Sequence, residues 1–429
     1  MQRLETIHPT EVELGLTRIA TVARALQLLP VPQPVITVAG TNGKGSTVAV
    51  LEALLKASGY RTGVFTSPHL LRFNERIRVD GDEAPDAEII DAFVAIDAAR
   101  GDVSLTYFEF AALAALLVFR ARGVDIVVLE VGLGGRLDAV NIVDPSVAVI
   151  TSIDLDHQGW LGESRGEIAR EKAGILRHAV PAVIADPNPP PELLHCITKV
   201  GARPALFLGK EFTLASADGQ WQAVVQGVDG RPRQLLPQRS GAMLPENMCA
   251  AIQAALLLGI TLSDEAIALA LENAAPLGRR QSRKLMGRDY VLDVAHNPAA
   301  VCKLIEYLRA TPCEGKTIGL FSVMADKDVQ SILQGAVGHF DAWFLADQPD
   351  NERAARAADI AVLLRAAGES MISVSKNLRQ ALRRAQSMAR EGDRLVVFGS
   401  FTTVAAVLPV LDGLHDAAVD ADVIPQGEE

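Results

Sequence analysis

The sequence predicts an α/β protein whose sheets are mostly parallel, and three observations support this. Short apolar runs alternate with stretches of helical periodicity, as strands do with crossover helices. Several of these runs are almost continuously apolar, which is typical of strands buried on both faces of a parallel sheet. Four of them end at Gly40, Ser67, Glu130 and Asp154. Because ligands of such sheets bind beyond the carboxyl ends of the strands, a site is expected at these four positions.

The first half of the chain predicts strands, loops and helices in repeated order. Residues 34–40 predict a strand that runs into a glycine loop, and residues 46–59 predict a helix that stops at Gly59. The other elements expected in this half are a buried helix at 109–123 and strands at 60–68, 124–135 and 145–154.

The pattern changes in the second half. Residues 212–236 resemble a small β insert, and a helix is expected from Glu246 to Leu258. The segment 277–290 is basic and contains glycine, which is typical of a domain boundary. A second α/β unit is expected after it, with strands at 290–298, 316–323, 341–347 and 393–400.

Composition narrows the class of protein. The 429 residues are 49% hydrophobic, so the chain can bury large cores, and the net charge of −11 argues against a nucleic-acid partner. The four cysteines form no C-x-x-C pair and predict reduced thiols. Residues 1–15 hold no apolar signal core, and the longest apolar run, 110–119, is too short to span a bilayer. We therefore expect a cytoplasmic monomer with no membrane partner.

Residues 38–50, VAGTNGKGSTVAV, are similar to a phosphate-binding loop but depart from it at two positions. Val38 stands where the usual pattern has glycine, and Gly45 stands where it has the hydroxyl that holds Mg²⁺. The order of strand, loop and helix still suits phosphate, because backbone N–H groups attract an anion and Lys44 adds a charge. The alternative is an ordinary glycine turn. No N-K-x-D guanine signature is present, so ATP is favoured over GTP, held by Gly40, Thr41, Asn42, Gly43, Lys44, Gly45 and Ser46.

A metal bound here needs ligands from outside the loop. The strand ends provide the hydroxyl of Ser67 and the carboxylate of Glu130, and a later loop provides His157. Mg²⁺ prefers oxygen and keeps several waters, so one carboxylate with phosphate oxygens is sufficient. A histidine ligand would indicate a second, more distorted site. The alternatives are a hydrogen-bonded loop histidine for His157 and a structural carboxylate for Glu130.

Several motifs together resemble the folylpolyglutamate synthase family within the wider Mur-ligase group. In order along the chain they are GTNGKGS, TSPHL followed by FNERIRV, LTYFEFAAL, EVGLGGRLDAVN, TSIDLDHQGWLG, EKAGI, LPENMCAA, GRR, DVAHNP, MADKD and FGSFTTV, from residue 40 to residue 404. Each is weak alone, but their order is specific. LTYFEF together with LGGRLDA most resembles the bacterial members that have both dihydrofolate synthase and folylpolyglutamate synthase activity.

The resemblance implies a fold, a cofactor set and a reaction. It implies a P-loop ATPase-like domain at 1–278 that carries the insert, a smaller Rossmann-like domain at 284–429 and an active site in the cleft between them. One Mg²⁺ would be held by Ser67 and Glu130, and a second by Glu130 and His157. Lys172 would be a carbamate near the second metal. The implied enzyme joins L-glutamate to dihydropteroate and to tetrahydrofolate through an acyl phosphate, with Lys44, Lys172, His157 and Glu130 as the catalytic set.

Further roles are carried over from the resemblance, residue by residue. Asn247, Arg279 and Asp293 match positions that contact ATP. His296 and Ser400 match positions near the incoming glutamate. Thr106, Phe108 and Asp138 match a pterin pocket. From the residues alone, Asn247 is equally a helix cap, Phe108 a core residue and Asp138 a turn residue.

Three other functions are weighed against this one. A monofunctional folylpolyglutamate synthase would share nearly all these motifs. A cell-wall Mur ligase is disfavoured, because only 39 residues precede Gly40 and those enzymes carry a sizeable domain there. A nucleotide-dependent switch would explain GTNGKGS but not the second α/β unit with DVAHNP.

Overall fold

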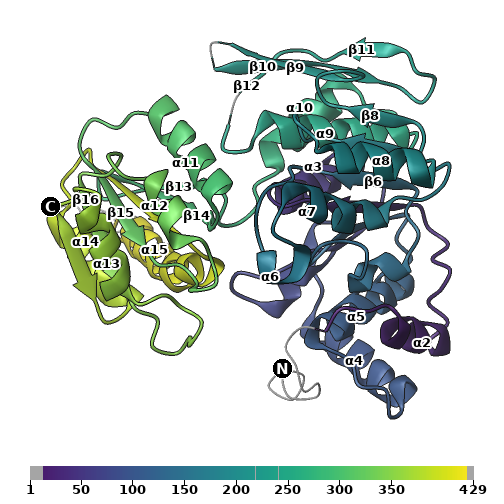
Figure 1. Cartoon of the computed structure of the whole chain (residues 1–429), viewed down its shortest axis with the longest axis horizontal. Helices are drawn as coiled ribbons and strands as arrows, with labels where there is room; N and C mark the ends of the chain where they lie inside the picture. Colours follow the sequence, from purple (N-terminus) through teal and green to yellow (C-terminus); the bar gives the residue numbers. More distant parts are fainter. Residues whose placement is uncertain (1–12, 218, 240, 423–429) are drawn as a thin grey trace, which may run out of the picture. The chain divides into compact units, whose positions relative to one another are not determined.

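The computed structural model in Figure 1 describes residues 13–217, 219–239 and 241–422. Most of the N-terminal stretch used above to argue against a signal peptide, residues 1–12, lies outside them. The chain divides into two compact units, Met1–Ala275 and Pro276–Glu429. Within the described ranges, no helix is both long and apolar enough to cross a membrane.

The first unit is built on an eight-stranded sheet in the order β4-β3-β2-β5-β1-β6-β7-β8. The six strands from β2 to β8 along this order are parallel, while β3 and β4 extend one edge in antiparallel fashion. The strands are β1 (Val35–Ala39), β2 (Thr62–Phe65), β3 (Ile77–Val79), β4 (Asp82–Glu83), β5 (Ile126–Glu130), β6 (Val147–Ile150), β7 (Ala182–Ile184) and β8 (Ala205–Phe207).

Helices cover both faces of this sheet, because each central strand is apolar on both sides. One face packs on α3 (Lys44–Ala57), α9 (Pro245–Leu257) and α10 (Asp264–Asn273). The core on the other face takes residues from α2 (Thr17–Ala25), α4 (Asp86–Arg100), α5 (Tyr107–Arg122), α6 (Gln158–Leu161), α7 (Arg165–Lys172) and α8 (Pro191–Val200). Three short 3-10 turns complete the unit: η1 (Phe73–Arg76), η2 (Ala139–Ile142) and η3 (Ala173–Ile175).

The expected β insert is a separate four-stranded sheet that lies beside α9 in Figure 1. Alternate residues of its longest strand, Trp221, Ala223 and Val225, are buried in the same core as α3 and α9. This period of two fixes which face of the insert is packed. Its strands are β9 (Thr213–Ala217), β10 (Gln220–Gln226), β11 (Pro232–Gln234) and β12 (Gln238–Arg239).

The second unit holds a six-stranded sheet in the order β13-β14-β18-β15-β16-β17, parallel except for β13. Its core centres on Phe321, Trp343 and Phe398, with the Phe321 and Phe398 ring centroids 4.8 Å apart. The strands are β13 (Gln281–Leu285), β14 (Arg288–Asp293), β15 (Thr317–Phe321), β16 (Ala342–Ala346), β17 (Ile372–Ser375) and β18 (Arg394–Phe398). The helices are α11 (Pro298–Ala310), α12 (Val329–Gln334), α13 (Ala357–Ala366), α14 (Leu378–Met388) and α15 (Phe401–Asp422).

The predicted fold class is confirmed: a large, mostly parallel sheet lies in the first unit and a second α/β sheet in the other. The basic segment that we expected to be a domain boundary contains strand β13, which pairs with β14 in antiparallel register from Gln281 to Leu285. Strand β17 was not expected from the sequence, because Ile372–Ser375 is short and only partly buried at the edge of its sheet.

Candidate active site

The carboxyl ends of four parallel strands meet at one edge of the first sheet. Strand register pairs Val38 with Glu130, Phe65 with Leu129 and Ala39 with Ile150. Neighbouring parallel strands run in the same direction, so the segments that follow them emerge side by side. The glycine loop, Ser67, Glu130 and the segment from Thr151 to Asp154 are therefore brought together.

The glycine loop is held by the segment that follows β6. The Thr41 N–H donates to the Ser152 carbonyl (2.7 Å), and the Thr151 hydroxyl donates to the Asn42 carbonyl (2.7 Å). The Thr41 hydroxyl donates to the Asp154 carbonyl and accepts from the Asp154 N–H. The sequence analysis did not assign Thr151 or Ser152 a role. Two hydroxyl residues directly after a buried strand, at the edge where the loop was expected, were the available signal.

Two glycines make this close packing possible. A Cβ at Gly40 would lie 1.6 Å from the Thr151 hydroxyl oxygen, and Gly40 has a φ of +154°. A Cβ at Gly43 would lie 2.3 Å from the Asn247 side-chain oxygen, at a φ of +90°. Asn247, in the first turn of α9, is therefore packed against the loop.

The rest of the loop begins helix α3. Gly45 and Ser46 lie in its first turn, and Ser46 is buried. The Lys44 ammonium donates to the Gly40 carbonyl (3.0 Å) and the Thr41 carbonyl (3.3 Å), so its charge lies over the loop. This arrangement of backbone, helix N-terminus and lysine can bind a phosphate group.

Glu130 is buried, only 2% exposed, and its Oε2 accepts a hydrogen bond from the Ser67 N–H (3.2 Å). The structure thus places the two expected metal ligands next to each other. The side chain of His157 is 40% exposed, and its backbone has a left-handed φ of +51°. Among the described residues, no three His, Cys, Asp or Glu side chains gather as a metal site would require. A metal at Glu130 would need oxygens from hydroxyl, water or phosphate as well.

Lys172 is buried at the end of α7 and is only 3% exposed. Burial and the nearby charge of Lys44 together lower the pKa of its ammonium to about 7, although Asp156 and Asp138 act in the opposite direction. At neutral pH a large fraction of this amine is therefore uncharged and nucleophilic.

The three residues expected in a pterin pocket differ in what their side chains do. The Thr106 hydroxyl caps helix α5 by accepting from the Glu109 N–H (3.2 Å). The Phe108 ring lies 5.6 Å from that of Phe65 and against Gly132, where a Cβ would be 2.6 Å from the ring. Thr106 is thus occupied as a cap, while Phe108 lies over the glycine turn that follows Glu130.

Asp138 holds that turn from the other side. Its carboxylate accepts from the Leu133 N–H (2.7 Å) and the Val140 N–H (3.1 Å). Burial raises its pKa to about 6, and the backbone N–H groups and Lys44 oppose this rise. Asp138 therefore fixes the loop between β5 and η2 and adds charge near Lys44 and Lys172.

Strands β14 and β18 of the second unit are parallel neighbours, and Asp293 pairs with Phe398 at their carboxyl ends. The predicted residues of this unit lie around these two strand ends: Arg279, Asp293, His296 and Ser400. Arg279 and His296 both approach the ring of Phe401, at 5.8 and 6.0 Å. The Asp293 carboxylate accepts from the Ala295 N–H (2.7 Å), and burial raises its pKa.

Ser400 is buried, and its hydroxyl is engaged within its own helix turn. It accepts from the Thr403 N–H (3.1 Å) and shares a hydrogen bond with the Thr403 hydroxyl (2.7 Å). The four predicted residues of this unit are thus close together, but the Ser400 hydroxyl is buried and hydrogen-bonded to the backbone of helix α15.

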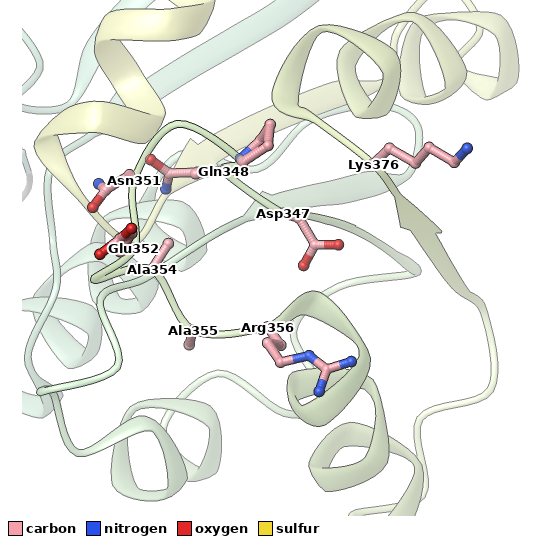
Figure 2. Close-up of a pocket in the computed structure, with 9 residues that line it drawn as sticks. Asp347, Gln348, Asn351, Glu352, Ala354, Ala355, Arg356 and Lys376 are labelled. Carbon is pink, nitrogen blue, oxygen red and sulfur yellow. The ribbon is translucent and has the colours of Figure 1, made fainter.

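A polar hollow of about 360 Å³ lies elsewhere in the second unit, beside the ends of β16 and β17. Figure 2 shows Gln348, Asn351 and Glu352 on one side of Asp347, with Lys376 extending away on the other. None of the predicted site residues lines it. Gln348 connects it indirectly to Ser400, because its amide nitrogen donates to the hydroxyl of Thr403 (3.4 Å), which in turn shares a hydrogen bond with Ser400.

The chain matches two family models, the Mur ligase middle domain over residues 38–210 and the Mur ligase, glutamate ligase domain over residues 278–401. The dihydrofolate synthase/folylpolyglutamate synthase of Escherichia coli (strain K12) is 40% identical over 411 residues, which are 95% of this chain and 94% of that protein.

Solved structures agree with the sequence relatives. E. coli FolC in complex with DHPP and ADP has a TM-score of 0.91 and 38% identity, covering 96% of this chain and 97% of that one. A bifunctional folylpolyglutamate synthase/dihydrofolate synthase with Mn, AMPPNP and L-glutamate bound has a TM-score of 0.87 and 39% identity, with the same coverage of both chains. The resemblance found in the motifs is confirmed, and the chain belongs to the dihydrofolate synthase/folylpolyglutamate synthase family.

Proposed function

We propose that this protein is an ATP-dependent ligase that joins L-glutamate to dihydropteroate, forming dihydrofolate, and to tetrahydrofolates, forming polyglutamates. The observation that carries the proposal is the meeting of the glycine loop, Glu130 and Lys172 in one unit of a chain with these relatives. A phosphate loop and a buried carboxylate that can hold a metal ion are groups that phosphoryl-transfer sites use, and the buried amine of Lys172 lies near the charge of Lys44. The ligands of the related structures, DHPP and ADP in one and AMPPNP, Mn and L-glutamate in another, favour the same reaction.

The chemistry requires activation of a carboxylate in water. A carboxylate oxygen of the pteroyl substrate attacks the γ-phosphorus of ATP, the bond to ADP breaks, and an acyl phosphate forms. The uncharged amine of glutamate then attacks the acyl carbon, inorganic phosphate leaves, and the amine loses a proton. Lys44 and the N–H groups of the loop bind and orient the phosphates, so the reacting atoms are held in line.

Magnesium fits the ligands that this unit provides. Ser67 and Glu130 would offer a hydroxyl and a carboxylate, and the hydrogen bond from the Ser67 backbone N–H to the Glu130 carboxylate supports this pairing. His157 would reach a second ion. A divalent ion bound there supplies positive charge for the phosphate oxygens. One carboxylate with a hydroxyl, waters and phosphate oxygens is a normal set for Mg²⁺.

Lys172 is proposed to work as a carbamate. Its amine is buried, and its pKa of about 7 leaves much of it neutral, which is the form that adds CO₂. The ammonium first loses one proton, and the neutral amine then adds CO₂ and loses a second proton. A cation beside Lys44 thereby becomes an anion with two oxygens. The change removes repulsion between two lysines and provides a group that orients the second metal or its waters.

The remaining assignments are proposed on position. Asn247, Arg279 and Asp293 would contact ATP. His296 and the turn at Ser400 would hold glutamate, and Phe108 with Asp138 would line the pterin pocket, where Thr106 serves by fixing the start of α5. The expectations of a monomer and of a cytoplasmic location stay predictions.

The first test identifies the products. Incubated with ATP, Mg²⁺ and L-glutamate, the protein should add one glutamate to dihydropteroate and further glutamates to a tetrahydrofolate, as measured by mass spectrometry. Phosphate should be released only when both acceptor and glutamate are present. Product from tetrahydrofolate alone would make the enzyme monofunctional, and phosphate release independent of both substrates would favour a nucleotide switch.

The second test removes the charge of Glu130. The Glu130→Gln variant is nearly isosteric, so it should fold normally, but turnover should fall by roughly 10³-fold because charge stabilisation of phosphoryl transfer is a large term. Steady-state kinetics and a thermal unfolding curve measure the two effects. Glu52→Gln is the matched control: Glu52 is also buried but pairs with Arg78, so its loss should lower stability and leave turnover within a few-fold. Near-normal turnover in Glu130→Gln would refute the role of this carboxylate.

The third test concerns Lys172. Lys172→Ala should lose turnover and regain part of it with acetate or formate, whose carboxylate replaces the carbamate. In the wild type, about a tenth of the amine is neutral at pH 6 if its pKa is about 7, so activity in CO₂-depleted buffer should fall as the pH falls and be restored by bicarbonate. Full activity without CO₂ and an unmodified mass for the native protein would contradict the carbamate.

Stability provides an independent measure of the same lysine. In CO₂-depleted buffer, Lys172→Met should raise the free energy of unfolding, since the unfolded chain keeps this amine protonated while the folded chain buries it. The folded pKa lies below the unfolded value of 10.5, so the gain should be full below about pH 7 and fade as the pH rises towards 10.5. The variant should nevertheless be inactive, which a purely structural lysine would not predict.

A further inference from the structure

Arg76 is a buried arginine that the assignments above do not use. It is the last residue of η1, leads into β3 and is only 8% exposed. Its Nε donates to the His69 Nδ1 (2.7 Å). Its guanidinium carbon lies 5.3 Å from the ring centroid of Tyr107 and 5.8 Å from that of Phe73. The guanidinium is therefore held by one hydrogen bond and two aromatic rings.

Within the described part of the chain, no carboxylate forms an ion pair with Arg76. Glu75 is its neighbour, but both oxygens of Glu75 accept from backbone N–H groups, those of residues 70 to 72. Arg78, two residues on, is half-buried and forms an ion pair with Glu52. A buried cation is costly unless it is paired, and an arginine does not lose its proton in a protein.

Arg76 lies near residues to which the proposed function gives a role in binding the metal and the pterin. The carboxylate of Glu130 is near enough to raise the pKa of Arg76, which burial lowers. Tyr107, whose ring contacts the guanidinium, lies between the two expected pterin residues Thr106 and Phe108 in the sequence. Arg76 is thus close enough to the carboxylate proposed for metal binding to be affected by its charge, and it contacts an aromatic ring that is adjacent in sequence to the residues proposed for the pterin.

The surroundings favour one kind of anion. The glycine loop and Lys44 already provide a site for phosphate, whereas Arg76 lies against the rings of Phe73 and Tyr107. The Phe73 ring packs in turn on Tyr107 and on Phe93, with centroids 5.8 and 5.5 Å apart. A ligand whose carboxylate is attached to an aromatic ring fits these surroundings, because its ring can contact the aromatic side chains while its carboxylate pairs with the guanidinium of Arg76. The planar guanidinium can also hold both oxygens of a carboxylate, which a lysine cannot do as specifically.

We propose that Arg76 binds the carboxylate of the pteroyl substrate that becomes phosphorylated. This inference rests on the proposed function and names the residue that orients its first reacting group. The guanidinium offsets the repulsion between this carboxylate and the phosphates of ATP and turns one of its oxygens towards them. Because the contact is made before the reaction, its loss weakens substrate binding as well as turnover.

A different role is possible for the same contacts, and it predicts different results. Arg76 also connects to His69, in the segment that carries Ser67, so it would act as a clamp on that segment if it bound no substrate. A clamp would affect every ligand of the site alike. A carboxylate-binding residue affects only ligands that carry the carboxylate.

The experiment compares two ligands that differ only in that group, pteroate and its neutral carboxamide, by equilibrium binding in the presence of Mg²⁺ and AMPPNP. The wild type should prefer pteroate by about 10- to 100-fold, as expected for a hydrogen-bonded charge pair. Arg76→Gln should abolish this preference while its affinity for the carboxamide stays within about threefold of the wild-type value and ADP binding is unchanged. Arg78→Gln, the matched control, should keep the preference.

Two more variants keep the test decisive. His69→Ala removes the partner of the Arg76 Nε but leaves the charge, so it should retain the preference for pteroate. Arg76→Lys, which serves if Arg76→Gln does not fold, should retain a reduced preference. Equal loss of both ligands in Arg76→Gln and His69→Ala would overturn the proposal in favour of the clamp, as would a preference for pteroate that survives in Arg76→Gln. A wild type that binds neither ligand would contradict the proposed function itself.

Discussion

The pairing of β1 with β5 and β6 in parallel register is the constraint on which the rest of this site depends. It places Val38 opposite Glu130 and Ala39 opposite Ile150, so the glycine loop emerges between a buried carboxylate and a pair of hydroxyl residues. A shift of one residue in a strand would turn its side chains to the other face of the sheet. The Thr151 hydroxyl donates to the loop and the Ser152 carbonyl accepts from it, and these two hydrogen bonds keep the loop backbone close to β6. Glycine at 40 and 43 allows that approach.

Buried charge distinguishes this edge of the sheet from the surrounding core. Lys172 and Asp138 are both almost inaccessible, and burial moves their pKa values towards neutrality, to about 7 and about 6. Such groups are costly to a fold, and they are concentrated where Lys44 and Asp156 also lie. Titratable groups with strongly shifted pKa values often mark functional sites, and here they occur beside a phosphate-binding loop. The second unit also has a buried carboxylate at the end of a strand: Asp293 is the last residue of β14, and burial raises its pKa.

Sequence patterns predicted the architecture well because the strands of both sheets are nearly continuous apolar runs. Gly40, Ser67 and Glu130 were found from their positions at the ends of such runs, and Asn247 was carried over from motif resemblance alone. Local patterns could not show what depends on tertiary packing. Lys172 has the pattern of an exposed helical lysine, and only the packing of α7 buries it. In FNERIRV the arginines at 76 and 78 look alike, and only the fold gives Arg78 a carboxylate and Arg76 two aromatic rings.

The central claim is that the carboxylate is activated by phosphorylation, and transfer of an oxygen isotope tests it most directly. Dihydropteroate labelled with ¹⁸O in its carboxylate would be converted with ATP, Mg²⁺ and L-glutamate, and the released phosphate analysed by mass spectrometry. An acyl phosphate requires that one carboxylate oxygen leaves with the phosphate, so each molecule of product should be accompanied by one phosphate that carries a single ¹⁸O. Unlabelled phosphate formed together with normal amounts of dihydrofolate would contradict the account.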